Sequence, residues 1–350
     1  MPGLLDGITV LDLSSVGPAA RASRWLADYG AHVTKVAPPR RHGDVQITPP
    51  FYAYSGHRGM DRIEIDLKSD DGTAAFLDRA ERADVVIESF RPGVVDRLGI
   101  GYDAVAARNP RIVYCSTSGY GQTGPRAHWA GHDLNYLAAG GYLACSGRDE
   151  RGGPALPGAT IADGAGGGMH AAMSILAALT SRATTGRGTY LDVSVADGLL
   201  ALMSLSIDQY LATGQEPGPR ADLLTGRYAC YDVYRCGDDN WLAVAAIEPR
   251  FYANLCTALG AEEWIPRQTD DAAQPDIRAA FTRAFATKPR DDWVATLGPA
   301  DTCVSAVASV AELVLDEHFR ARSAFVTAHT EDGEPYEQVG WVLAGMEETR

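Results

Sequence analysis

Hydrophobic and polar residues in the first two hundred positions alternate between short β-branched runs and longer stretches of helical spacing. The short runs predict strands at 7–13, 32–36, 62–67, 84–88, 111–116 and 189–195. The longer stretches predict helices at 19–29, 71–82, 91–98, 103–108 and 169–179. The last of these is apolar on nearly all sides, so it is expected to be buried. Strands that alternate with helices at short range are typical of a parallel sheet, and an α/β fold is therefore predicted.

The pattern changes after 213–220, where glycine and proline predict a linker. Two apolar runs, 229–234 and 241–246, flank a polar turn and are expected to pair as strands. A helix at 276–287 carries apolar residues at helical spacing, which predicts a second, smaller core. The predicted organisation is a large domain at 1–212, a linker at 213–228, a small domain at 229–302 and a return to the large domain at 303–350.

Composition and charge narrow the class of protein. A chain of 350 residues with 46% apolar residues can bury a large core, and its length suggests roughly two domains. Acidic residues outnumber basic ones by 45 to 31, which argues against a nucleic-acid partner. The most apolar stretches, 169–179 and 198–207, are shorter than the ~20 residues that cross a bilayer. With no leader before the first strand, we expect a cytoplasmic protein without a membrane partner.

The cysteines argue against a disulfide framework. They have no CxxC spacing and lie in apolar sequence, so we expect reduced thiols in the core and no metal site. The six are Cys115, Cys145, Cys230, Cys236, Cys256 and Cys303.

Three side chains are candidates for proton-transfer chemistry. His132, beside Asp133, is expected on a loop before the apolar segment 134–143. Asp163 is expected at a helix N-cap, and Glu248 directly after a strand. An imidazole and two carboxylates are the usual parts of proton transfer, yet each position also suits a loop histidine, a cap or a surface acid. Spacing alone favours these structural roles.

A dinucleotide-binding site is a poor alternative on the motifs of the sequence. No GxGxxG follows the first strand, and no GxxxxGK[ST], HExxH or GxSxG is present. The glycine run at 164–168 follows an acid, and such a run more often permits close backbone packing than it binds phosphate.

Eight motifs in the same order along the chain resemble the family III CoA transferases (CaiB/BaiF family), especially their α-methylacyl-CoA racemase branch. The motifs are 7–12 with Gly17-Pro18, 66–68, 88–93, 119–125, 131–136, Asp163 with its glycines, 186–197 and 247–252. Plain transferases of this family keep the aspartate but usually lack the Gly-His-Asp and Ile-Glu-Pro motifs. This chain has both, and the resemblance therefore favours functional roles for His132, Asp163 and Glu248.

The resemblance implies a Rossmann-like large domain with a parallel sheet, a smaller α+β domain and two chains interlocked as a homodimer. The active site would lie between large and small domains, which can come from different protomers. The substrate would be an acyl-CoA thioester, a lipid metabolite, with no cofactor beyond its CoA moiety. The implied CoA-binding residues are Ile65, Asp66, Leu67, Lys68, Ser89, Phe90, Arg91, Arg97, Gly131, Asp133, Leu134, Asn135 and Tyr136.

Three of the implied CoA-binding residues are positively charged, as expected for a CoA site, because CoA phosphates need cations. Lys68, Arg91 and Arg97 are basic positions in an acidic chain. Arg97 is explained equally well as a solvated surface charge. Relatives often carry an arginine after the second strand where this chain has Pro38, so Arg40 or Arg41 would have to replace it.

Inversion of a carbon α to a thioester needs a base on one face, an acid on the other and an enolate between them. His132 and Asp163 can form that pair, since histidine titrates near neutrality and a desolvated aspartate holds a proton. By the resemblance, Glu248 would bond the far nitrogen of His132. Backbone N–H groups beside Asp163 would stabilise the enolate, and Gly164 and Gly166 would let the thioester approach.

Two alternatives stay open. In the first, the protein is a CoA transferase in which Asp163 attacks a thioester and carries the acyl group as a mixed anhydride. The segment 157–160 resembles the transferase branch, and 221–225 departs from the racemase pattern. In the second, it is a CoA-binding protein with a degenerate site, as the altered CoA loop and the missing acidic helical tail suggest. The acyl group, whether fatty, steroid side chain or aryl-propionyl, is left open.

Overall fold

The computed structural model describes residues 3–39, 58–330 and 332–341. Its chain divides into two compact units, which are treated separately below. The large unit comprises Met1–Tyr142, Pro157–Asp208 and Glu317–Arg350. The small unit comprises Leu143–Leu156 and Gln209–Asp316.

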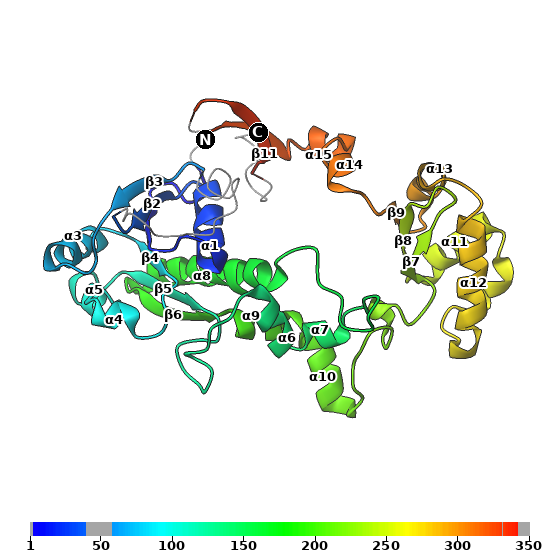
Figure 1. Ribbon diagram of the computed structural model, residues 1–350, viewed down its shortest axis with the longest axis horizontal. Coiled ribbons are helices and arrows are strands. Elements are labelled where there is room, and N and C mark those ends of the chain that lie inside the picture. The colour runs from blue at the N-terminus through cyan, green and yellow to red at the C-terminus, as the bar shows by residue number, and fades with distance from the viewer. Residues whose placement is uncertain (1–2, 40–57, 331, 342–350) are drawn as a thin grey trace. The chain divides into compact units, whose positions relative to one another are not determined.

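A six-stranded parallel sheet organises the large unit (Figure 1). In spatial order its strands are β3 (Asp61–Glu64), β2 (His32–Ala37), β1 (Thr9–Asp12), β4 (Val85–Glu88), β5 (Val113–Ser118) and β6 (Thr189–Ser194). The predicted parallel sheet is confirmed. Strand order reverses between β1 and β4, and doubly wound sheets bind ligands beside such a reversal, at the carboxyl ends of the strands.

Helices cover both faces of this sheet. Side chains alternate in direction along each strand, so each face presents apolar side chains to its own layer of helices. Val10, Val85 and Val113 join a core with α1 (Gly17–Asp28) and α8 (His170–Thr185). Their neighbours, such as Val86 and Tyr114, join a second core on the other face. The helices of that face are α3 (Asp70–Ala80), α4 (Val94–Arg97) and α5 (Tyr102–Arg108).

Helix α8 is not buried on all sides, contrary to the prediction for 169–179. Ala171 and Ile175 are fully buried on the sheet, whereas Met173 is 64% exposed and Met169, just before the helix, is 54% exposed. One strip of the helix meets the sheet, and no described residue of the large unit covers the opposite strip. An apolar residue there raises the hydropathy of the sequence without adding to the core.

The glycine run permits close backbone packing, as predicted. It forms a π-helix, Ala162–Met169, that continues into α8 and packs against α1 and α9 (Val195–Leu202). A Cβ on Gly198 of α9 would lie 1.8 Å from the carbonyl oxygen of Gly166. A Cβ on Gly167 would lie 2.5 Å from Cβ of Pro18. Side chains at these positions would force the helices apart.

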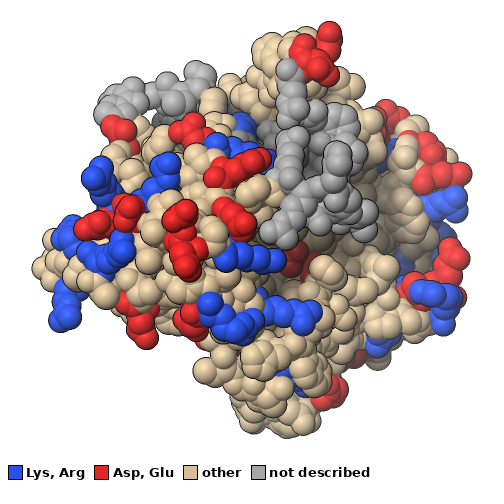
Figure 2. Space-filling view, turned by 60° about the vertical axis from the view of Figure 1, so that its left-hand side comes forward, with Lys and Arg blue, Asp and Glu red and all other residues tan. Residues whose placement is uncertain are grey.

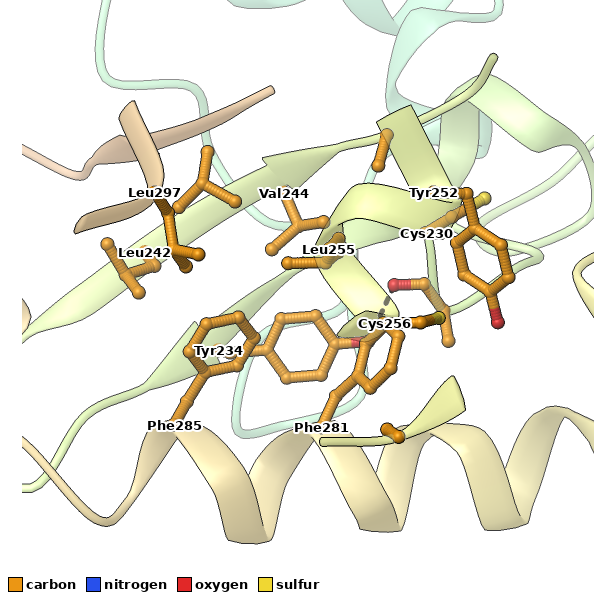
Figure 3. Packing of buried hydrophobic residues seen from close by; sticks show 14 of the residues in the cluster. Cys230, Tyr234, Leu242, Val244, Tyr252, Leu255, Cys256, Phe281, Phe285 and Leu297 are labelled. Atoms are coloured by element: carbon orange, nitrogen blue, oxygen red, sulfur yellow. Dashed lines mark hydrogen bonds between the residues drawn. The ribbon is translucent and has the colours of Figure 1, made fainter. Parts of the chain in front are cut away.

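The small unit contains an antiparallel sheet with the strand order β7 (Tyr231–Arg235), β8 (Trp241–Ala245) and β9 (Val304–Ala306). The predicted pairing of the first two strands is confirmed. Large aromatic side chains fill the core behind them (Figure 3). Tyr234 packs against Phe285 and Phe281, and its hydroxyl donates to the Ala229 carbonyl at 2.7 Å. The helices around this core are α11 (Pro249–Leu259), α12 (Gln274–Phe285) and α13 (Arg290–Leu297).

The remaining elements are short. They are α6 (Asp133–Ala139), α7 (Tyr142–Cys145), α10 (Ser204–Thr213), α14 (Val310–Leu313), α15 (Glu317–Ala321), the antiparallel pair β10 (Phe325–His329) and β11 (Pro335–Val339), and 3₁₀ turns at Leu223–Thr225, Glu262–Arg267, Asp271–Ala273 and Gly298–Ala300. In the described part of the chain, no helix combines the length and the apolar character that spanning a membrane requires.

All six cysteines are free, which agrees with the prediction of reduced thiols. Their expected place in the core is wrong for Cys303, which is exposed, and Cys145 is only partly buried. Cys303 lies just before β9 and has a positive φ of 52°, which is typical of a turn. Its side chain therefore lies at a turn and not inside the core.

Candidate active site

Asp163 lies in the large unit, inside the first turn of the π-helix. The expectation of an N-cap was wrong, because the helix already begins at Ala162 and the preceding Ile161 has helical dihedral angles. As a helical residue, Asp163 has an N–H group without a partner in the preceding turn. That N–H donates to Oδ1 of Asp133 at 2.8 Å.

His132 and Asp133 lie at the start of helix α6. His132 is the residue before the helix and Asp133 is the first residue in it, so the expected loop ends one residue earlier than predicted. The N–H of His132 donates to Oδ1 of Asn135 at 3.0 Å, which secures the entry into the helix. The imidazole of His132 is exposed. Because Asp133 bonds Asp163 directly, the structure brings two of the three predicted catalytic residues into one cluster.

Charges around Asp163 act in opposite directions on its carboxyl group. Burial raises its pKa, and the nearby Asp133 carboxylate adds to that rise. Arg21 and His132 lower the pKa because each favours the ionised form. The net shift is upward, so Asp163 holds a proton more readily than an exposed aspartate does.

Tyr136 supports the loop that carries His132. Its hydroxyl donates to the Gly131 carbonyl at 2.6 Å, and its ring meets Tyr120 edge to face with centroids 5.2 Å apart. A Cβ on Gly119 would lie 2.4 Å from the hydroxyl, so glycine is required for this contact. Burial, with Asp163 and Tyr120 nearby, raises the pKa of Tyr136 to about 12, and its hydroxyl therefore stays protonated.

Arg21 of α1 also belongs to this cluster, although no sequence motif predicted it. Its guanidinium donates to the Thr160 carbonyl at 3.2 Å and to the Thr160 hydroxyl at 2.5 Å. It also lies over Gly164, where a Cβ would be 3.1 Å from Nη1. An isolated arginine on an amphipathic helix carries no recognisable signal, because only the fold brings α1 to the π-helix.

Gly166 does not have the role predicted for it. Its Cβ position points at α9, 3.0 Å from the Val195 carbonyl oxygen, so Gly166 serves helix packing rather than the approach of a thioester. Gly164 is the neighbour that lies toward Arg21.

The expected CoA-binding residues lie on segments that follow the carboxyl ends of strands. The segment 65–68 follows β3, 89–91 follows β4, and 131–136 begins α6 after the glycine loop that follows β5. Ile65 is buried, while Lys68, Ser89, Arg91 and Arg97 are exposed and Leu134 is 45% exposed. Arg40 and Arg41 lie outside the described residues. On the face drawn in Figure 2, basic and acidic side chains of the described residues are interspersed.

Glu88 lies beneath the second of these segments, although the sequence suggested no role for it. It ends β4, is 2% exposed and accepts the N–H of Phe90 at 2.7 Å. Burial raises its pKa to about 7, hydrogen bonds from Ser116 and Phe90 oppose the rise, and Asp96 and Asp192 add to it. A buried, titrating carboxyl group therefore lies at the switch point of the sheet.

Glu248 belongs to the small unit. It is exposed and lies just before Pro249, at the start of α11. Contrary to the prediction, it does not follow a strand directly, because β8 already ends at Ala245. The structure therefore places His132 and Asp163 together in the large unit and Glu248 in the other unit. Among the described residues, no group of histidine, cysteine, aspartate and glutamate side chains is arranged to hold a metal ion.

Comparison with known proteins identifies the family. The family model described as CoA-transferase family III matches residues 5–350. The chain is 35% identical to the α-methylacyl-CoA racemase of Homo sapiens over 95% of its own length and 85% of that protein. It is 33% identical to the acetyl-CoA:oxalate CoA-transferase of Acetobacter aceti over 89% of its length and 82% of that protein.

A solved structure gives the same result. The crystal structure of a CaiB/BaiF family protein from Brucella suis has a TM-score of 0.78 at 27% identity, covering 96% of this chain and 91% of that one. This chain belongs to the family III CoA transferases, the CaiB/BaiF family. The resemblance of the eight motifs is confirmed, and the family contains both racemases and transferases.

Proposed function

We propose that this protein is a racemase or epimerase of 2-methylacyl-CoA thioesters that works by proton transfer through an enolate. The observation that carries the proposal is the cluster of Asp133, Asp163 and His132 at adjoining helix starts. The similarity to the human racemase supports the same reaction. A plain transferase would need the aspartate alone.

In this reaction one of the pair, His132 or Asp163, removes the C2 proton, and the electron pair moves onto the thioester oxygen. The other member returns a proton to the opposite face of C2, and the carbonyl re-forms. The raised pKa of Asp163 suits a carboxyl group that must be protonated in one direction and ionised in the other. For Glu248 we keep the role that the resemblance implies, which is to orient His132 through its far nitrogen.

The proposal includes a CoA site on the segments 65–68, 89–91 and 131–136, with Lys68, Arg91 and Arg97 as cations for phosphate. It also includes an interlocked homodimer. Exposed apolar residues of the large unit support a second chain, because a chain that covered them would remove their apolar surface from water. They are Met169, Met173, Leu200, Leu202 and Leu205, with exposed fractions between 48% and 66%.

A CoA transferase with a mixed anhydride on Asp163 is the second candidate. The similarity to the Acetobacter aceti enzyme favours it, as does the cation of Arg21, which stabilises an ionised, nucleophilic Asp163. This reaction requires a free carboxylic acid as acceptor, whereas racemisation does not.

The test is C2 proton exchange of a single (2S)-2-methylacyl-CoA in deuterated water, followed by NMR without any acid acceptor. We expect loss of the C2 signal together with appearance of the R epimer. His132→Ala should slow the exchange by roughly 10²- to 10⁴-fold, the range typical of a general acid or base. The matched control is His128→Ala, which removes an exposed histidine from the preceding loop and should leave the rate unchanged.

Three results would decide against the proposal. Full exchange in the His132→Ala variant would remove the histidine from the mechanism. A persistent C2 proton, with CoA moving to added carboxylic acids, would establish the transferase. CoA binding without either reaction would leave a binding protein with a degenerate site.

A further inference from the structure

Glu88 is a buried carboxyl group that the proposed reaction does not use. It is the last residue of β4, at the strand end where the order of the sheet reverses, and it is 2% exposed. An ionised carboxyl group in such a place costs free energy unless it is paired with a cation. The acids Asp96 and Asp192 lie near it and make that cost larger. A role for Glu88 therefore lies in the groups that it bonds.

Two uncharged donors hold the carboxyl group of Glu88. Its Oε2 accepts the N–H of Phe90, two residues further along the chain, at 2.7 Å. The hydroxyl of Ser116 donates to the same carboxyl group. Ser116 is the residue directly opposite Glu88 in the parallel pair of β4 and β5. Glu88 therefore ties the backbone that leaves β4 to the neighbouring strand.

The segment 89–91 is fixed at two points. The N–H of Phe90 is bonded to Glu88, and the Phe90 side chain packs against the core on that face of the sheet. Ser89 and Arg91, on either side of it, are exposed. Because Phe90 is anchored inward, its two neighbours are held outward, which lowers the conformational entropy that a ligand would otherwise lose by ordering them.

We propose that Glu88 is a positioning residue for CoA binding, whose carboxyl group holds the segment 89–91 in the conformation that receives the CoA phosphates. This inference rests on the CoA site of the proposed function, which includes Ser89, Phe90 and Arg91. In this role Glu88 acts through the Phe90 backbone without touching the ligand. Its effect should therefore fall on binding and not on proton transfer.

The charge of Glu88 has a further consequence for binding. Burial raises its pKa to about 7, so the carboxyl group is partly protonated near neutral pH. Negative phosphates bound on the adjoining segment favour the neutral form, so CoA binding should be accompanied by proton uptake. By the same linkage, CoA affinity should fall as the pH rises through 7, because the ionised carboxyl group must then gain a proton on binding.

Other titratable groups lie around Glu88. They are Tyr114 and Cys115 of β5, Tyr190 and Asp192 of β6, Asp96 of α4, and Asp12 of β1, which pairs with Lys35 of β2. Burial raises the pKa of Tyr114, Cys115 and Tyr190, so these three stay protonated near neutral pH. The charges of Asp96 and Asp192 disfavour ionisation of Glu88.

The experiment compares Glu88→Met, which removes the acceptor, with Glu88→Gln, which keeps an acceptor oxygen but cannot ionise. CoA affinity is measured by calorimetric titration, and kcat and KM by C2 exchange in deuterated water. We expect Glu88→Met to weaken CoA binding and raise KM by about 5- to 100-fold, the cost of one unsatisfied buried donor, with kcat within about threefold of wild type. At pH 6, where Glu88 is mostly protonated, Glu88→Gln should match the wild-type affinity within about threefold.

Glu64→Met is the matched control. Glu64 ends β3 just before the segment 65–68, as Glu88 ends β4 before 89–91, but it is exposed. Its replacement should change CoA affinity by less than about twofold.

Proton uptake is measured by titrating CoA at pH 7 in two buffers of different ionisation enthalpy. The wild-type protein should show a buffer-dependent enthalpy and an affinity that falls between pH 6 and pH 8. Both effects should be smaller in Glu88→Gln. The phosphates of CoA titrate alike with the two proteins, so the difference between them isolates Glu88.

Failure of the inference differs from failure of the proposed function. Equal CoA affinity in the wild type and Glu88→Met overturns the role of Glu88 alone, as does a lowered kcat with unchanged KM. An equal loss of affinity in Glu88→Met and Glu88→Gln also contradicts it, because the acceptor oxygen would then not be what the segment needs. If Glu88→Met does not fold, equal pH dependence of CoA affinity in the wild type and Glu88→Gln decides against the inference.

The wild-type protein tests the proposed function itself. Absence of CoA binding overturns the CoA site and the inference with it. CoA binding without C2 exchange overturns the racemase function but not the role of Glu88, which the affinities of the variants decide.

Discussion

The core of the small unit and the glycine seam of the large unit pack in opposite ways. The seam is the contact of Gly167 and Gly168 with α1 and of Gly166 with Gly198 on α9. In the small unit, aromatic side chains fill the space between sheet and helices. In the seam, missing side chains let backbones touch. The first arrangement is therefore weakened by removing atoms and the second by adding them.

The difference in packing also affects the candidate active site. The π-helix that carries Asp163 begins in the seam, and the close approach of α1 brings Arg21 to Gly164 and Gly168. A conventional core of large side chains would separate these helices and move the arginine away from the aspartate. In the large unit, packing and site geometry depend on the same glycines, whereas the aromatic core of the small unit serves stability.

Removal of a large, fully buried ring from the small unit should have the greatest effect on stability. Phe281→Ala takes a fully buried ring from between Tyr234 and Tyr252, so we expect the free energy of unfolding of the small unit to fall by about 3–5 kcal/mol. Denaturation followed by hydrogen exchange of the β7 and β8 amides measures it. Val310→Ala, at a site 76% exposed, should change stability by less than about 0.5 kcal/mol. Equal effects would refute the contrast between core and surface.

The second largest effect on stability is expected at Glu88, a buried polar residue of the large unit. The pKa of Glu88 is raised from 4.5 to about 7, so its contribution to stability is present below pH 4.5 and is lost as the pH rises through 7. At about 1.4 kcal/mol per pKa unit, the loss is about 3 kcal/mol. Glu88→Gln stays neutral and should lack this loss while keeping an acceptor for the Phe90 N–H.

The measurement is the free energy of unfolding of both proteins between pH 4 and pH 8. Other groups titrate alike in the two proteins, so the difference between the curves isolates Glu88. Parallel curves would show that Glu88 ionises normally in the folded state.

Adding one methyl group to the seam should have the smallest effect on stability. Gly198→Ala places a Cβ 1.8 Å from the Gly166 carbonyl oxygen, and we expect a loss of about 1–3 kcal/mol as the helices separate. Because Asp163 moves with the π-helix, C2 exchange should fall as well. Gly158→Ala is the control, since a Cβ there meets nothing within 4 Å. An unchanged exchange rate in Gly198→Ala would show that the seam serves packing alone.

Much of the fold could be predicted from the sequence because its signals are local. The strand and helix alternation, the pairing of β7 with β8 and the close packing at the glycine run all follow from periodicity and turn chemistry within short windows. The domain limits, the site roles and the homodimer stay predictions. The predictions were wrong where one local pattern fits two structures. The apolar stretch 169–179 was expected to be buried but has an exposed strip, and Asp163 lies inside a helix rather than at its cap.

The sequence by itself determined the alternating strands and helices around the parallel sheet, the pair β7 and β8 and, through eight motifs, the family. Only the tertiary structure decided which distant residues meet: Asp133 with Asp163, Arg21 with Gly164 and Gly168, and Glu88 with Ser116. The physical reason is one of range. Periodicity reports which face of an element is buried, whereas the partner of that face depends on how whole helices and strands pack against one another.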